Sequence, residues 1–193
     1  MFEEFVALVS ELFPSLNPAT AARCLGHVAD REIDPGRLFL LRPFQYLAQG
    51  DIIDPIALVV AEEDGLLLRY DGPGILLSNT CDAEHDEHVL LAASFWLRTY
   101  LENNPTDEAT LRSNCIFNLM FLPWVGADGR GIVNDLSWIQ THSRASIMNG
   151  LRCGVIRKVA SLSDIGFYLL LAKLTVHLLR PEAAESLAAR GGR

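Results

Sequence analysis

The sequence predicts an α+β fold, in which a small antiparallel β-barrel is preceded by a helical segment and followed by a C-terminal helix. Short apolar runs separated by turn signals begin after Gly50, and this spacing favours a small barrel over a parallel sheet. A stripe of apolar residues at helical spacing lies between residues 161 and 180. A separate helical pattern starts the chain. We therefore expect an N-terminal helical extension over residues 1–46 and a barrel domain with its C-terminal helix over residues 47–193.

The N-terminal extension is predicted to contain two helices. Apolar residues recur at helical spacing over residues 2–13, and Pro14 ends that helix. Asn17 and Pro18 favour a second start, because asparagine is a common N-cap and proline suits the first helical position. The apolar run at residues 38–47 fits no single pattern, and its structure stays open.

The first half of the barrel domain is predicted to contain three strands. Its first run is rich in isoleucine, valine and leucine, and Pro55 within it predicts an edge strand or a bulge. Acidic residues and glycines between the runs predict turns. The expected elements are a strand at 51–60, a turn at 62–65, a strand at 66–70, a turn at 71–74 and a strand at 75–78.

The second half of the domain alternates in the same way. Asn104-Pro105 is expected to interrupt an ambiguous segment, because the residue before a proline disfavours helix. The other expected elements are a polar loop at 82–87, a strand at 89–93, an apolar run at 116–125, a glycine-rich hairpin turn at 126–131 and a returning strand at 132–139.

The C-terminal helix has the clearest pattern. Ser161 or Ser163 is expected to cap it, and Pro181 ends it. Its buried stripe is predicted to consist of Phe167, Leu170, Leu171, Leu174 and Leu178. Lys173 and His177 lie on one side of the helix, which we expect to be the solvated face opposite that stripe.

The composition limits which partners the chain can bind. Half of the 193 residues are hydrophobic and 21% are charged, so there is ample material for a core. The net charge of −8 disfavours broad electrostatic binding of nucleic acid, duplex DNA in particular, because such binding needs clustered lysine and arginine. A small, local basic site is still compatible with this charge.

The sequence also predicts a cytoplasmic protein without a membrane segment. The longest purely apolar run, residues 167–172, is far shorter than the roughly 20 residues of a membrane-spanning helix. The first residues contain neither a basic segment nor the apolar centre of a signal peptide. The four cysteines are widely spaced and form no CxxC pair, so we expect reduced thiols rather than a disulfide framework.

Five segments of the barrel domain follow one another in an informative order. They are Gln49-Gly50-Asp51-Ile52-Ile53, then Gly72-Pro73-Gly74 before an apolar strand ending in Ser78-Asn79, then Val89-Leu90-Leu91-Ala92-Ala93-Ser94, then Asn134-Asp135-Leu136-Ser137-Trp138-Ile139, and finally Val159-Ala160-Ser161-Leu162-Ser163-Asp164. In this order they resemble the PemK/MazF family of small toxins, with residues 1–46 outside the resemblance. The resemblance implies an SH3-like barrel from a bacterial or phage toxin–antitoxin or defence system. It also implies a dimer, an antitoxin-like protein partner or single-stranded RNA as ligand, and no cofactor.

The resemblance also implies positions for a ribonuclease site. Members of the family cut RNA without a metal ion, by attack of the ribose 2′-hydroxyl on the adjacent phosphate. Such a site needs a proton acceptor and a cation near the phosphate. The family's main arginine corresponds to Gly72 and a later arginine to Ser137, so both guanidinium groups are lost, whereas the hydroxyl of its threonine or serine is kept at Ser94. The candidate replacements for the lost charge are Arg69, Arg98 and Arg144.

His142 and Arg144 form a candidate catalytic pair after the late strand. Imidazole titrates near neutral pH, so it can act as a base, and guanidinium binds phosphate oxygens through paired hydrogen bonds. The alternative is a polar loop that leads into a helix and has no chemical role.

A second reactive-looking stretch has C-x3-H-x2-H spacing. Cys81, His85 and His88 are weak candidates for zinc ligands, or for a cysteine nucleophile beside a histidine. The alternative is a solvated loop, which the four carboxylates between these residues would suit.

Two functional hypotheses follow. In the first, the chain is a PemK/MazF-like barrel that is weak or inactive as a ribonuclease and works by binding a partner. In the second, it is a divergent, metal-independent endoribonuclease that cuts single-stranded RNA with Ser94, His142 and either Arg144 or Arg69. Whether the protein is an enzyme stays open at this point.

Overall fold

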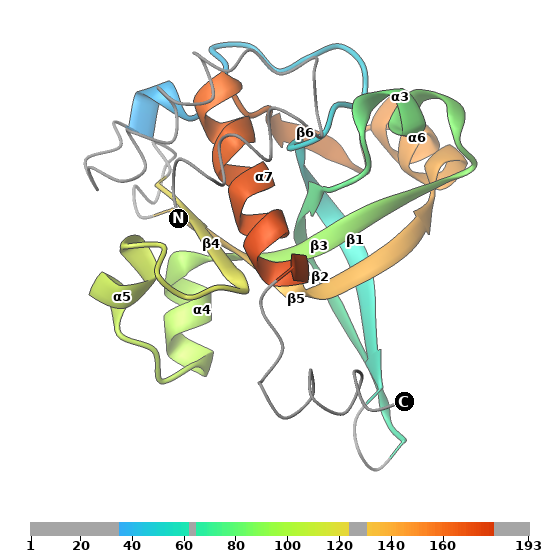
Figure 1. The fold of residues 1–193 in the computed structure, drawn as a ribbon. Coiled ribbons are helices and arrows are strands. Elements are labelled where there is room, and N and C mark those ends of the chain that lie inside the picture. The colour runs from blue at the N-terminus through green and yellow to red at the C-terminus, as the bar shows by residue number, and fades with distance from the viewer. Residues whose placement is uncertain (1–34, 62–64, 124–130, 180–193) are drawn as a thin grey trace, which may run out of the picture.

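The computed structural model describes residues 35–61, 65–123 and 131–179, and there it confirms an α+β fold (Figure 1). In this part of the chain six strands form one antiparallel sheet in the order β4-β5-β3-β2-β1-β6, accompanied by five α-helices. The strands are β1 (Ile52–Ala61), β2 (Leu67–Leu76), β3 (His88–Trp96), β4 (Leu119–Leu122), β5 (Ile132–Ser143) and β6 (Arg157–Ala160). The helices are α3 (Thr80–His85), α4 (Leu97–Asn103), α5 (Glu108–Arg112), α6 (Arg144–Arg152) and α7 (Asp164–Leu179), with a 3-10 turn η1 (Pro35–Arg37).

Some predicted elements fall on other parts of the chain. The two N-terminal helices, most of the turn at 62–65 and most of the hairpin turn at 126–131 lie outside the described residues. The strands predicted at 51–60, 89–93 and 132–139 are confirmed by β1, β3 and β5.

The sheet has a hydrophobic core on each of its two faces. Successive residues of a strand point to opposite faces, and Ile52 and Ile53 of β1 accordingly belong to different clusters. Helix α7, which crosses the sheet in Figure 1, packs on the first face through Ile165 and Leu169. Helix α6 packs on the second face through Ile147. A third cluster lies beneath α4 and α5 and consists of Leu97, Tyr100, Leu111, Leu119, Phe121 and Val133.

The sheet is open within the described residues, because its end strands β4 and β6 do not pair with each other. Strand β6 pairs with β1 only at Ile52, Ile53 and Asp54. The adjacent Pro55 lies in a bulge between Ile53 and Ile56, which confirms the bulge predicted from this proline. A bulge tolerates proline because the extra residue is left out of the hydrogen-bonded ladder.

The turn predicted at residues 71–74 is wrong, because β2 continues through it as a ten-residue strand. The glycines there are explained by crowding, and neither has a left-handed backbone. A Cβ atom at Gly72 would lie 2.2 Å from the hydroxyl oxygen of Tyr70, and one at Gly74 would lie 2.0 Å from Cδ1 of Ile56. Glycine in this strand therefore marks the close approach of other side chains.

The polar loop predicted at residues 82–87 is also wrong over most of its length, because helix α3 forms there. The side chain of Asn79 accepts a hydrogen bond from the N–H of Cys81 at 2.9 Å, which is the interaction of a helix N-cap. Ala83 is buried against the second face of the sheet. A dense run of charges therefore contains one buried position that anchors a short helix.

Helix α7 confirms the predicted C-terminal helix, but Leu178 of the predicted buried stripe is 67% exposed. Ser163 is its cap, since its Oγ accepts a hydrogen bond from the N–H of Gly166 at 3.3 Å. None of the helices in the described residues combines the length and apolar character needed to cross a membrane.

One side chain of α7 corrects the expected solvated face. Lys173 is only 7% exposed, and its ammonium donates to the carbonyl oxygens of Asn114 and Ile116 at 2.5 and 2.7 Å. Burial lowers the pKa of Lys173 to about 8. The lysine therefore fastens the α5–β4 loop to α7 and is not a surface charge.

A buried carboxylate joins the start of the domain to its end. Asp51 is fully buried and accepts from the ammonium of Lys158 at 2.6 Å and from Ser161 Oγ at 2.5 Å. Lys158 also donates to the carbonyl oxygen of Phe44 at 2.9 Å. The segment at 38–47, left open by the sequence, is therefore held against β1 and β6 by this ion pair.

Candidate functional site

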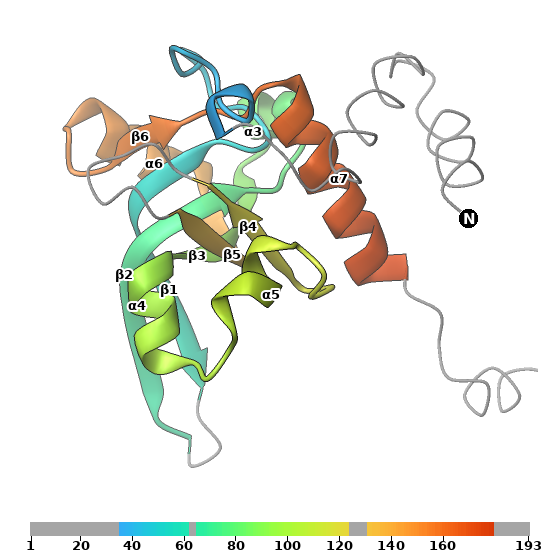
Figure 2. The same ribbon diagram turned by 90° about the vertical axis from the view of Figure 1, so that its left-hand side faces the viewer.

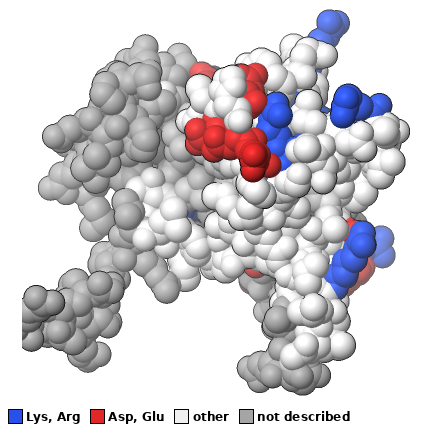
Figure 3. Space-filling view, turned by 90° about the vertical axis from the view of Figure 1, so that its right-hand side faces the viewer, with Lys and Arg blue, Asp and Glu red and all other residues white. Residues whose placement is uncertain are grey.

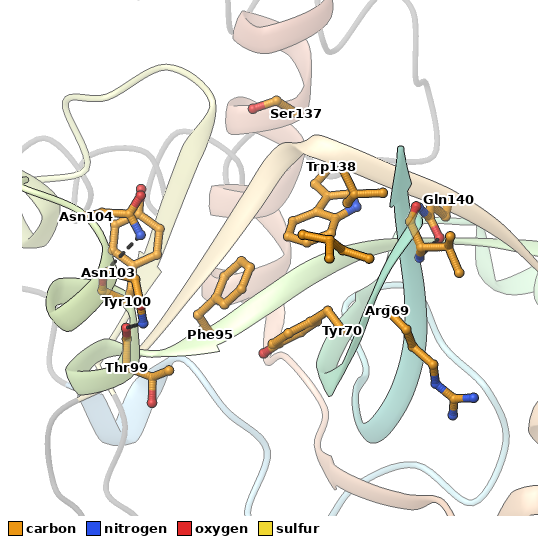
Figure 4. A pocket seen from close by; sticks show the side chains of 13 residues that line it. Arg69, Tyr70, Phe95, Thr99, Tyr100, Asn103, Asn104, Ser137, Trp138 and Gln140 are labelled. Carbon is orange, nitrogen blue, oxygen red and sulfur yellow. Dashed lines mark hydrogen bonds between the residues drawn. The ribbon is translucent and has the colours of Figure 1, made fainter. Parts of the chain in front are cut away.

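A hollow of about 860 Å³ lies between the β1–β2 hairpin and α4, which are neighbours in Figure 2. We call it the aromatic groove. It is lined by Val59, Val60, Leu68, Arg69, Tyr70, Phe95, Thr99, Tyr100, Asn103, Asn104, Ser137, Trp138 and Gln140. Its residues come from β1, β2, β3, β5 and α4, so the groove exists only when the curled sheet has formed (Figure 4).

The floor of the groove is a cluster of aromatic rings from three different strands. The ring of Tyr70 lies 4.8 Å from that of Phe95 and 5.8 Å from that of Trp138, and Phe95 and Trp138 are 5.8 Å apart. Tyr100 of α4 adds a fourth ring 5.9 Å from Phe95. Such separations are typical of favourable tilted pairs, so the rings form a continuous apolar surface.

Tyr70 is fixed in this cluster by its hydroxyl group. Its hydroxyl donates to the carbonyl oxygen of Ser94 at 2.9 Å, and burial raises its pKa to about 12. The phenol therefore stays protonated and serves as a structural donor. Because its hydroxyl would lie 2.2 Å from a Cβ at position 72, the tyrosine takes the space that a side chain on Gly72 would need.

The rim of the groove is polar and nearly neutral. Asn103 at the end of α4 and its C-cap Asn104 lie there, with their amide groups turned back to the carbonyl oxygens of Thr99 and Tyr100. Of the lining residues only Arg69 is charged, and it forms a bidentate ion pair with Asp71, with the shortest N–O distance at 2.8 Å. The groove therefore suits uncharged ligands better than a polyanion.

Ser94, the hydroxyl that the resemblance singles out, does not line the groove. It is fully buried and donates to Asn134 Oδ1 at 2.7 Å, while Asn134 donates to the carbonyl oxygen of Met120 at 3.0 Å. It lies next to Phe95 in β3, and neighbouring residues of a strand face opposite sides of the sheet. Ser94 therefore faces away from the aromatic groove, whose lining includes Arg69.

His142 lies far from Ser94 along the same pair of strands. In the β3–β5 ladder His142 is opposite Val89, whereas Ser94 is opposite Asn134. Val89 and Ser94 are five residues apart on β3, which corresponds to roughly 17 Å. Burial lowers the pKa of His142, and its Nε2 is buried without a hydrogen-bond partner among the described residues.

Arg144 meets a different set of predicted residues. A second hollow, of about 450 Å³, is lined by His85, Asp86, Glu87, His88, Ser143, Arg144 and Ala145. We call it the histidine–arginine hollow. Its arginine is partly engaged, because Nε donates to the carbonyl oxygen of Ala83 at 2.8 Å. Acidic and basic side chains lie next to each other on the face shown in Figure 3, which includes the α3–α6 region.

The possible metal site finds no support in this geometry. Cys81 is exposed at the start of α3 and does not line the histidine–arginine hollow with His85 and His88. Across the described ranges, no group of three or more histidine, cysteine, aspartate or glutamate side chains is placed to hold a metal ion.

No model of a protein family matches the sequence, and no curated protein matches it. The site therefore has to be interpreted from its own geometry.

Sequence reasoning missed the floor of the aromatic groove. Nothing in the sequence singles out Tyr70, Phe95 or Trp138 as a group, because single aromatic residues in strands are common. The missing information is strand register, which places Tyr70, Phe95 and Trp138 on the same face. Alternation shows which residues of one strand share a face of the sheet. It does not show which strands are adjacent.

Proposed function

We propose that this chain is a PemK/MazF-like barrel protein of a toxin–antitoxin or phage-defence system that acts by binding a protein partner, with weak or no ribonuclease activity. Two of the segments that carry the resemblance meet in space, since Asp51 of the first accepts a hydrogen bond from Ser161 of the last. The carboxamide of Gln140 in β5 also reaches the backbone of Val59 in β1, which is consistent with a sheet curled towards a barrel.

The observation that carries the proposal is an aromatic floor at the place where a ribonuclease would need charge. Tyr70 fills the space beside Gly72, and the charge of Arg69 is matched by Asp71. Ser94 is enclosed on the other side of β3. Cleavage of RNA requires a cation at the phosphate in the transition state, and the aromatic groove offers no unmatched one.

A protein ligand fits the surface better than a nucleic acid does. Large apolar side chains are exposed on the β1–β2 hairpin beside the groove, including Val59, Leu67 and Leu68 at 45, 67 and 46%. Contiguous exposed apolar surface is typical of protein interaction sites. The partner in this proposal is an antitoxin-like protein, and a homodimer is the competing arrangement.

Purified full-length protein incubated with single-stranded RNA in the presence of EDTA tests the proposal. We expect no cleavage above the rate of the Ser94→Ala variant, because Ser94 is enclosed. Cleavage that resists EDTA and is lost in Ser94→Ala would overturn the proposal. Trp138→Ala, which removes part of the groove floor, should abolish partner binding, whereas the exposed-site control Arg152→Ala should not.

A second candidate function, a divergent metal-independent endoribonuclease, rests on the histidine–arginine hollow. There Arg144 lies with His85 and His88, a combination that can supply both an acid or base and a phosphate contact. If this function is present, Arg144→Ala and His85→Ala should each relieve growth inhibition in cells, while Ser94→Ala leaves it unchanged. If growth inhibition persists in both Arg144→Ala and His142→Ala, neither His142 with Arg144 nor His85 with Arg144 is a catalytic pair.

A further inference from the structure

Strand β1 has an outer edge that changes character along its length. Its first part pairs with β6 at Ile52, Ile53 and Asp54. From Ile56 to Ala61 it pairs with β2 on one side, and no other strand of the described chain covers the opposite side. The second part of β1 is therefore a strand edge beside the aromatic groove.

One side chain already occupies this edge in the way a peptide would. The N–H of Val59 donates to Gln140 Oε1 at 3.0 Å, and Gln140 Nε2 donates back to the carbonyl oxygen of Val59. Two residues facing each other in an antiparallel ladder exchange the same pair of bonds. The carboxamide of Gln140 therefore stands in for one residue of a missing strand.

This contact also tells which backbone groups face outwards. Because Val59 turns both its N–H and its carbonyl towards Gln140, these groups point away from β2. Backbone direction alternates along a strand, so Ala57 and Ala61 also present their N–H and carbonyl groups to the outer side. Leu58 and Val60 direct theirs towards β2. Three outward positions spaced two residues apart are enough for a short added strand.

The surroundings of the edge define the chemistry of an occupant. Val59, Leu67 and Leu68 are exposed on the hairpin, and Tyr70 and Trp138 form the floor beside it. The single charged lining residue is neutralised by Asp71, so neither an acidic nor a basic ligand is favoured. An uncharged chain with apolar side chains at alternate positions therefore matches this edge and the groove beside it.

We propose that the outer edge of β1 at Ala57, Val59 and Ala61 binds an extended, uncharged, apolar peptide segment of a partner protein as an added strand, and that this segment displaces the carboxamide of Gln140. Strand addition supplies affinity through backbone hydrogen bonds, and the aromatic groove receives alternate side chains. The inference rests on the partner-binding function proposed above and specifies how the partner binds.

The test uses the full chain and peptides selected on it from a displayed random library. Binding of a selected synthetic peptide should slow amide hydrogen exchange at residues 57, 59 and 61, and leave 58 and 60 unchanged because those already bond to β2. Gln140→Ala removes the competing carboxamide and should tighten peptide binding about 5-fold. Arg152→Ala, a change at an exposed residue of α6 outside the groove, is the control and should leave peptide binding unchanged. Should Gln140→Ala fail to fold, Gln140→Asn, whose side chain is too short to reach Val59, replaces it.

Three outcomes would overturn the inference. Peptides that bind without protecting amides 57, 59 and 61 would leave partner binding intact and exclude strand addition. If the same amides become protected without peptide as the protein concentration rises, and sedimentation shows dimers, the edge binds a second copy of this chain instead. If the library yields no binding peptide, the inference that the β1 edge binds a peptide is wrong. If the protein also binds or cleaves a single-stranded RNA oligonucleotide in the same experiment, the proposed function is wrong as well.

Discussion

At the scale of single residues, position 72 determines what the aromatic groove is made of. Without a side chain at Gly72, the ring of Tyr70 can lie across β2 and donate to the carbonyl oxygen of Ser94. This couples two features that seem unrelated in the sequence, a glycine within a strand and a tyrosine two residues before it.

Replacing Gly72 by arginine should destabilise the protein by about 1–3 kcal/mol, because the new side chain overpacks the space held by Tyr70. The double variant with Gly72→Arg and Tyr70→Ala should lose less free energy of unfolding than the sum of the losses in the two single variants. Urea unfolding of the four proteins measures the coupling. Gly74→Ala with Tyr70→Ala is the control cycle and should be additive, since a Cβ at Gly74 meets Ile56 instead; additivity in the Gly72 cycle as well would contradict the argument.

His142 should make the protein less stable in acid. Burial lowers its pKa in the folded state below the ordinary value of 6.5, so the unfolded chain binds the proton more readily. The contribution of neutral His142 to stability is therefore present at pH values above its pKa in the unfolded chain. This contribution is lost as the pH falls below that pKa.

The measurement compares the free energy of unfolding of wild type and His142→Phe at pH values on either side of 6.5. The difference between the two proteins should shift in favour of the variant as the pH falls. Val155→Ala, a change at an exposed side chain without a titratable group, should show no such shift. An equal acid response in wild type and His142→Phe would exclude His142 as the cause.

At the scale of elements, periodicity predicted those features that depend on local pattern. β1, β3, β5 and α7 were recognisable because each is a run of apolar residues with strand or helix spacing. β2 was cut in two because glycine and proline favour turns, whereas here Gly72 and Gly74 make room for side chains from elsewhere. Such contacts are tertiary, so a single sequence contains no local sign of them. The aromatic groove was missed for the same reason.

Helix α7 offers a direct measure of its cap. Ser163→Ala removes the acceptor for the N–H of Gly166 and the hydrogen bond that Ser163 Oγ donates to the carbonyl oxygen of Arg37. The expected loss is about 1 kcal/mol of unfolding free energy. Thr175→Ala, which deletes a bond to Leu171 within the same helix, is the control and should cost less than the loss of the cap. Equal losses would show that Ser163 has no special role.

At the scale of the whole molecule, Asp51 connects parts of the chain that are more than 100 residues apart. Lys158→Met would leave this carboxylate buried without its cation, which typically costs about 3–5 kcal/mol. Asp51→Asn in the same protein should restore part of that stability, because the uncompensated charge is then gone. Urea unfolding of the single and double variants measures the coupling.

The chain contains a second ion pair for comparison, whose cation is exposed. Arg157 contacts Asp54 at 3.2 Å, but its side chain is 75% exposed. Arg157→Met should therefore cost under about 1 kcal/mol. If Lys158→Met and Arg157→Met lowered the free energy of unfolding by the same small amount, the buried ion pair of Asp51 and Lys158 could not be what holds segment 38–47 to the sheet.

The contact between Tyr70 and Gly72 also restricts which side chains positions 70 and 72 can hold at the same time. A protein with a side chain at position 72 can lose it without a clash, whatever residue occupies position 70. With any side chain at position 72, a tyrosine at position 70 cannot keep this ring position, because its hydroxyl oxygen would lie 2.2 Å from the Cβ atom. A charged side chain at position 72 and the present aromatic floor therefore exclude each other, so the chain can present a cation there only if the ring of Tyr70 leaves its place.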